Sequence, residues 1–84
     1  MTDEIRTGVV SVELANAVRT INAAHARAGS PELPDLREEW HRLDRSLRLA
    51  TVAGDTRAAR IAVDRYRENS LAVIEKAAAE RESA

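Results

Sequence analysis

Apolar residues recur at alternating intervals of four and three along most of this chain. That spacing places them on one face of an α-helix. Three such stripes are present: Val10, Leu14, Ala17, Ile21, Ala24 and Ala28, then Leu36, Trp40, Leu43, Leu47 and Ala50, then Ala59, Val63, Tyr66, Ser70, Val73 and Ala77. Ser70 is the only polar member. The pattern therefore predicts three one-sided helices.

Glycine, proline and aspartate mark where these helices end and begin. Gly29 and Gly54 stand where a C-cap glycine is expected, and Asp55 is a candidate N-cap for the third helix. Asp35 and Glu38 have capping-box spacing at the start of the second. The predicted helices span residues 3 or 11 to 28, 35 to 53 and 56 to 80, with a frayed tail over 80–84.

Short connections make consecutive helices antiparallel neighbours. We therefore predict an all-α fold, an up-down-up three-helix bundle formed by a helical hairpin and an N-terminal helix, with residues 1–84 as one domain. In the simplest version the second helix lies between the other two. Trp40 then faces the small residues Ala24 and Ala28, a large side chain against small ones.

The composition predicts a thin core for this bundle. The chain has 84 residues and is 44% apolar, but it contains no Phe and only one Trp and one Tyr. A domain this small buries only about 60–65% of the surface that its unfolded chain exposes. We therefore expect either very regular helix packing or burial against a second chain, with dimerisation completing the bundle.

A second apolar set lies off the three stripes. In the up-down-up arrangement its members fall at the same end of the molecule, and a contiguous apolar patch on a small protein usually marks an interface. The predicted partner interface consists of Ile5, Val9, Val12, Leu49, Val52 and Ile61.

Two alternatives compete with this interface at the N-terminus. In one, the first helix starts at Ser11 and residues 5–10 form an arm folded over the turn between the second and third helices. In the other, Val10, Val12 and Leu14 alternate as a strand that adds to the sheet of another molecule. Gly8 favours the arm over the helix, because glycine costs about 1 kcal/mol inside a helix.

The pattern of charged residues suggests an alternative function. Thirteen basic and 14 acidic residues leave a net charge of −1, so no overall field attracts nucleic acid or membrane. A local strip that is suited to phosphate nevertheless runs over the second and third helices: Arg42, Arg45, Arg48, Arg57 and Arg60. Interleaved acidic residues and the lack of a stacking aromatic favour a solvated face over a nucleic-acid site.

Candidate catalytic chemistry is sparse. The segment AHARAGS around His25 resembles a histidine phosphotransfer motif, which implies a phosphorylated histidine, but Ala28 stands where that family has lysine. We expect His25 to be a half-buried histidine near a helix end and His41 to face solvent. Without cysteine, a Gly-rich loop or a histidine–carboxylate cluster, the sequence predicts no metal, no cofactor and no enzymatic activity.

The remaining expectations concern location and role. The N-terminus lacks the apolar segment of a signal peptide, and the longest apolar run has four residues, which predicts a cytoplasmic protein. Arginine replaces lysine almost throughout, a bias typical of GC-rich bacterial or phage genomes. The predicted function is a non-enzymatic accessory, adaptor or inhibitor subunit that contacts a protein partner or a second copy, with a nucleic-acid-associated regulator as the alternative.

Overall fold

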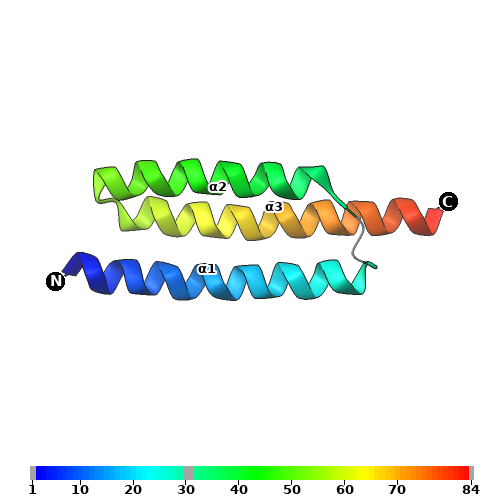
Figure 1. Cartoon of the computed structure of the whole chain (residues 1–84), viewed down its shortest axis with the longest axis horizontal. Coiled ribbons are helices and arrows are strands. Elements are labelled where there is room, and N and C mark those ends of the chain that lie inside the picture. The colour runs from blue at the N-terminus through cyan, green and yellow to red at the C-terminus, as the bar shows by residue number, and fades with distance from the viewer. Residues whose placement is uncertain (1, 30–31, 84) are drawn as a thin grey trace.

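The computed structural model is a three-helix bundle with the predicted up-down-up order (Figure 1). It describes residues 2–29 and 32–83, and side chains from residue 10 onward. The helices are α1 (Thr2–Arg27), α2 (Pro34–Ala53) and α3 (Thr56–Ser83), and no strand occurs in this part of the chain. The predicted fold class is therefore confirmed.

The start of α1 shows whether residues 5–10 belong to the helix or form an arm before it. The helix begins at Thr2, so Gly8 lies inside it and the predicted arm is wrong. The predicted strand at Val10, Val12 and Leu14 is wrong for the same reason. The helix includes Gly8 at a propensity cost of about 1 kcal/mol.

The turn between α2 and α3 forms as predicted. Gly54 adopts the left-handed conformation, with φ of 66°, and Asp55 donates its backbone N–H to the Ala50 carbonyl at 2.9 Å. The Asp55 side chain then accepts the Ala58 N–H at 3.0 Å, which caps α3. The hairpin is thus defined by two adjacent residues.

The start of α2 differs from the prediction. The helix begins at Pro34, whose fixed φ suits the first helical position, and the extended residue Leu33 is the N-cap. No side chain caps this end, so the predicted capping box of Asp35 and Glu38 does not form. Asp35 instead lies in the first turn, where its negative charge interacts favourably with the helix dipole.

The central helix is α3, and not the second helix as predicted. It packs against both α1 and α2, whereas no Cα atom of α1 lies within 8 Å of a Cα atom of α2 among the described residues. Figure 1 shows α3 between the other two helices. The bundle is elongated, with extents of 52 × 18 × 15 Å. One side of α3 is therefore left open between its two neighbours.

The core follows the stripes, with two differences. Its buried side chains come from all three helices: Ala17, Ile21, Leu43, Val63, Tyr66 and Ile74. Ile74 lies outside the predicted stripe, which continues from Ser70 to Val73, three residues later. In the structure the fully buried position after Ser70 is Ile74, four residues later. Trp40, which was predicted to face Ala24 and Ala28 in the core, is instead 45% exposed, and it makes a T-shaped ring contact with Tyr66 at 5.7 Å between centroids.

Ser70 is fully buried on α3, and its hydroxyl has no hydrogen-bond partner among the residues that the structure describes. A buried, unpaired polar group costs about 1–3 kcal/mol. We expect Ser70→Ala to raise the free energy of unfolding by about 1 kcal/mol, measured by urea denaturation. Ser46→Ala, at an exposed position of α2, is the control for helix propensity. A Ser70→Ala variant no more stable than this control would contradict the unpaired state of the hydroxyl.

Candidate docking groove between α1 and α2

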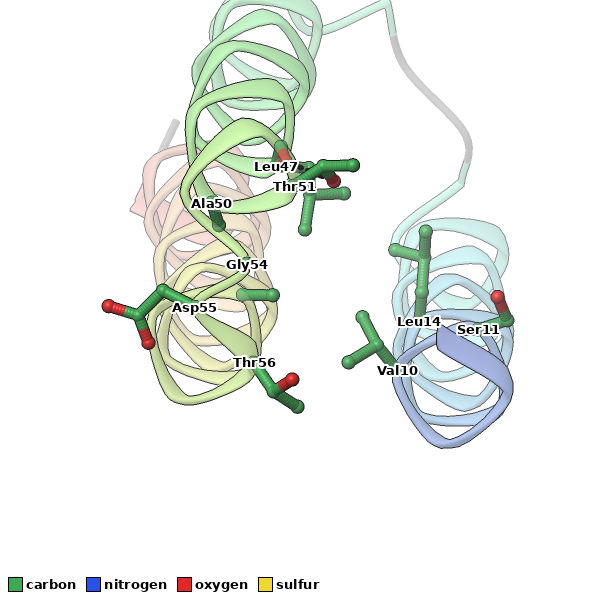
Figure 2. Close-up of a pocket in the computed structure, with 10 residues that line it drawn as sticks. Val10, Ser11, Leu14, Leu47, Ala50, Thr51, Gly54, Asp55 and Thr56 are labelled. Carbon is green, nitrogen blue, oxygen red and sulfur yellow. Dashed lines mark hydrogen bonds between the residues drawn. The ribbon is translucent and has the colours of Figure 1, made fainter. Parts of the chain in front are cut away.

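An open groove lies between α1 and α2, above the N-terminal part of α3. Val10 and Leu14 of α1 face Leu47 and Thr51 of α2 across it, as Figure 2 shows. The small residue Ala59 of α3 forms its floor. The groove exists because α3 holds the other two helices apart, so their facing apolar side chains are only partly covered.

One part of this groove, which we call the hollow, is mainly apolar with polar residues at its edge. Its wall also includes Ser11, Thr56 and the turn residues Gly54 and Asp55. Its volume is about 290 Å³, just below the range of about 300–1,000 Å³ that is typical of small-molecule pockets. No set of converging polar groups is present to orient a ligand. The hollow is therefore better suited to a large apolar side chain.

Trp40 lies further along α2, and Asp44, which pairs with Arg48 at 3.1 Å, stands between it and Leu47. Trp40 precedes Leu47 by seven residues and Thr51 by eleven, which places all three on one strip of the helix. Its ring is half-exposed while one edge contacts Tyr66, and burial raises the pKa of the Tyr66 hydroxyl. The groove side of α2 thus carries a hollow and a projecting aromatic ring, about two helical turns apart.

The predicted interface residues are exposed wherever their side chains are described. Val12, Leu49, Val52 and Ile61 are between 43% and 89% exposed. The side chains of the other two, Ile5 and Val9, lie outside the described residues.

These four residues face different directions. Leu49 and Ile61 line one shallow groove between α2 and α3, on the side away from the hollow. Val12 and Val52 follow directly after Ser11 and Thr51, which line the hollow, and neither of them lines it. The structure therefore brings together Leu49 and Ile61 but places Val12 outside the groove that they form.

Three of the five arginines in the predicted phosphate strip are paired. Arg42 contacts Glu38 at 3.7 Å and Glu39 at 3.0 Å, and Arg48 contacts Asp44 at 3.1 Å. These are contacts along α2 at intervals of three and four residues, so they neutralise the strip locally. Whether Arg45 and Arg57 contact phosphate stays a prediction.

Arg60 and Glu13 form an ion pair between two helices. The guanidinium group of Arg60 on α3 donates two hydrogen bonds to the Glu13 Oε1 atom on α1, at 2.7 and 3.1 Å. This hydrogen-bonded carboxylate raises the pKa of Arg60. Because guanidinium N–H groups of Arg60 already donate to Glu13, this side chain is better explained as a link between α1 and α3 than as a phosphate ligand.

The histidines do not form a site. His25 is half-buried near the end of α1, as expected, and His41 is exposed on α2. Within residues 10–29 and 32–83, no three His, Asp or Glu side chains gather as metal ligands would. In the same part of the chain, none of the helices combines the length and the apolar character that crossing a membrane requires.

The sequence did not predict the groove. Leu14 and Leu47 belong to the predicted core stripes, Ser11 was considered only as the start of a shorter first helix, and Thr51 was given no role. A signal was present, because Trp40, Leu47 and Thr51 share one strip beside the core face of α2. Comparison with protein-family models, with curated proteins and with solved structures finds no match to this chain.

Proposed function

We propose that this protein is a non-enzymatic protein–protein interaction module that binds through the groove between α1 and α2. The observation that carries this proposal is the open, mainly apolar hollow, with a half-exposed tryptophan about two helical turns away along α2. Protein interfaces are centred on buried aromatic anchors in pockets from which charged side chains are largely absent. The hollow is lined mainly by uncharged residues, with Asp55 at its edge, and Trp40 supplies an exposed aromatic side chain on the same helix.

We also propose that the protein has a role within a larger system. An accessory, adaptor or inhibitor subunit of a bacterial or phage system requires only a rigid surface and no reacting groups. The described residues supply such a surface on helices rather than on loops. The paired arginines make the nucleic-acid alternative weaker, since Arg42, Arg48 and Arg60 already contact carboxylates.

Affinity capture with matched variants tests this proposal. Thr51→Glu adds a charge to the hollow, Val52→Glu adds the same charge one residue away, and Leu49→Glu adds it to the other shallow groove. All three positions are exposed, so the fold should be retained. We expect Thr51→Glu to weaken binding of the partner at least about tenfold, while Val52→Glu leaves binding unchanged.

Other results of the same experiment would assign the function differently. Loss of binding only with Leu49→Glu would move the interface to the groove between α2 and α3. Equal binding by all variants, in buffers from low to high salt, would contradict an apolar docking surface. Binding that instead falls steeply as salt rises, with DNA or RNA in the captured material, would support the arginine strip.

A further inference from the structure

We infer that Arg81 is a latch that fastens the C-terminal end of α1 to α3 and so limits how far α1, one wall of the groove, can move. The latch consists of the guanidinium group of Arg81, the backbone carbonyl of Ala28 and the turn residue Gly29. It is a conformational device that goes beyond the proposed function, because it acts whatever the groove binds. In the closed state Arg81 holds Ala28, and in the open state the end of α1 is free to leave α3.

Arg81 lies on the part of α3 that continues past the core. Ile74 is the last buried side chain that the structure describes, and the helix runs on to Ser83, past the start of α2 (Figure 1). Arg81 follows Ile74 by seven residues, so it lies on the same face two turns later. There its Nη1 atom donates a hydrogen bond to the carbonyl oxygen of Ala28, a residue that packs against the core. The contact joins residues that are 53 positions apart.

The chemistry of a helix end suits this contact. The last carbonyl groups of an α-helix have no partner within the helix and carry a partial negative charge. Ala28 directly follows Arg27, the last residue of α1. A guanidinium group therefore gives this carbonyl a donor and interacts favourably with the helix dipole. Because the contact is exposed to solvent, water competes with it, and the latch can open reversibly.

Gly29 leaves the space that the guanidinium group occupies. Its φ is 89°, and a Cβ atom at this position would lie only 2.8 Å from the Nη1 atom of Arg81. Gly54 also has a left-handed φ, of 66°, but no atom that the structure describes lies within 4 Å of the place of its Cβ. Gly54 is therefore required by the backbone alone, whereas Gly29 is required by the backbone and by Arg81.

A second contact fastens the other part of α1. The ion pair of Arg60 with Glu13 joins α1 to α3 close to the hollow, since Glu13 directly precedes Leu14 in its wall. Glu13 and Ala28 are 15 residues apart, which corresponds to about 22 Å along a helix. These two contacts hold α1 at separate points, so release of Arg81 frees the end that lies far from the hollow.

Hydrogen exchange of the 84-residue chain, followed by NMR, tests the latch at single amides. The N–H groups of Ala28 and Gly29 bond to carbonyls in the last turn of α1, and those of Gly54 and Asp55 bond to carbonyls near the end of α2. We expect Arg81→Ala to make the first pair exchange at least about fivefold faster. The second pair should keep the wild-type rate, because opening of that turn leaves the latch closed.

Arg65→Ala is the control for the loss of an exposed arginine from α3, since Arg65 lines the shallow groove between α2 and α3. It should leave the exchange of all four amides unchanged. Circular dichroism checks that both variants remain helical. If Arg81→Ala left the exchange of Ala28 and Gly29 unchanged, or accelerated exchange equally at both turns, the latch would be overturned.

A double-mutant cycle, measured by urea denaturation, tests the fit between Gly29 and Arg81. Gly29→Ala should raise the equilibrium constant of unfolding by a factor about five times larger in the wild type than in Arg81→Ala, because only the wild type has a latch to break. Gly54→Ala is the control, and it should raise the constant by the same factor in both backgrounds. Independent effects of Gly29→Ala and Arg81→Ala would overturn the latch.

Discussion

Replacing Leu43 by alanine is expected to lower the free energy of unfolding by about 2–5 kcal/mol. Leu43 is 3% exposed and is the large apolar side chain of α2 that is fully within the core. Its loss leaves a cavity between α2 and α3 in a core with few large residues to fill it. A chain of 84 residues has a total stability of about 4–13 kcal/mol. The variant should therefore approach the limit of folding.

Leu49→Ala is the matched control, because it makes the same change on the same helix at a side chain that is 73% exposed. It should change stability by less than about 0.5 kcal/mol. Thermal unfolding at one fixed chain concentration should separate the two variants by at least about 8 °C. Equal melting temperatures would mean that α2 does not pack on α3 through Leu43.

Enlarging Ala17 to leucine is expected to destabilise the protein by about 1–3 kcal/mol. Ala17 is 3% exposed and lies with Val63 where α1 approaches α3. Its small side chain lets the two helices approach closely, and three extra carbon atoms force them apart. Because α1 packs only on α3 among the described helices, the separation removes much of what holds α1 in place.

Ala23→Leu provides the comparison on α1, at an exposed alanine six residues later. It should leave the free energy of unfolding nearly unchanged, as measured by urea denaturation. If Ala17→Leu were also neutral, the close packing of α1 on α3 would be contradicted. A result in which Ala17→Leu increases stability would show an unfilled space at this contact.

The elements of this fold were predictable because their signals are local. Gly54 and Asp55 determine the second turn through a left-handed backbone and a side-chain cap, which depend on neighbouring residues alone. The apolar stripes predicted the helices and most of the core, because helical periodicity is also a local signal. The capping box at Asp35 failed because Pro34 allows the helix to start one residue earlier without a cap.

The arrangement of the helices was harder to predict, since it depends on contacts between distant residues. Periodicity shows which face of a helix is apolar, but it does not show how far its neighbours lie from that face. The periodicity therefore predicts that Leu14 and Leu47 are core residues, although in the structure they also border an open groove. The exposed positions Val12, Leu49, Val52 and Ile61 were identified correctly as exposed, but the directions in which they point depend on α3 being central.

The central position of α3 has a consequence for how the protein folds. The hairpin of α2 and α3 closes through two residues, so it loses little chain entropy in forming. Among the described residues, no Cα atom of α1 lies within 8 Å of a Cα atom of α2, so α1 docks mainly on α3. Folding is therefore expected to proceed from the C-terminal hairpin to the N-terminal helix, and α1 is the part that can detach while the remainder stays folded.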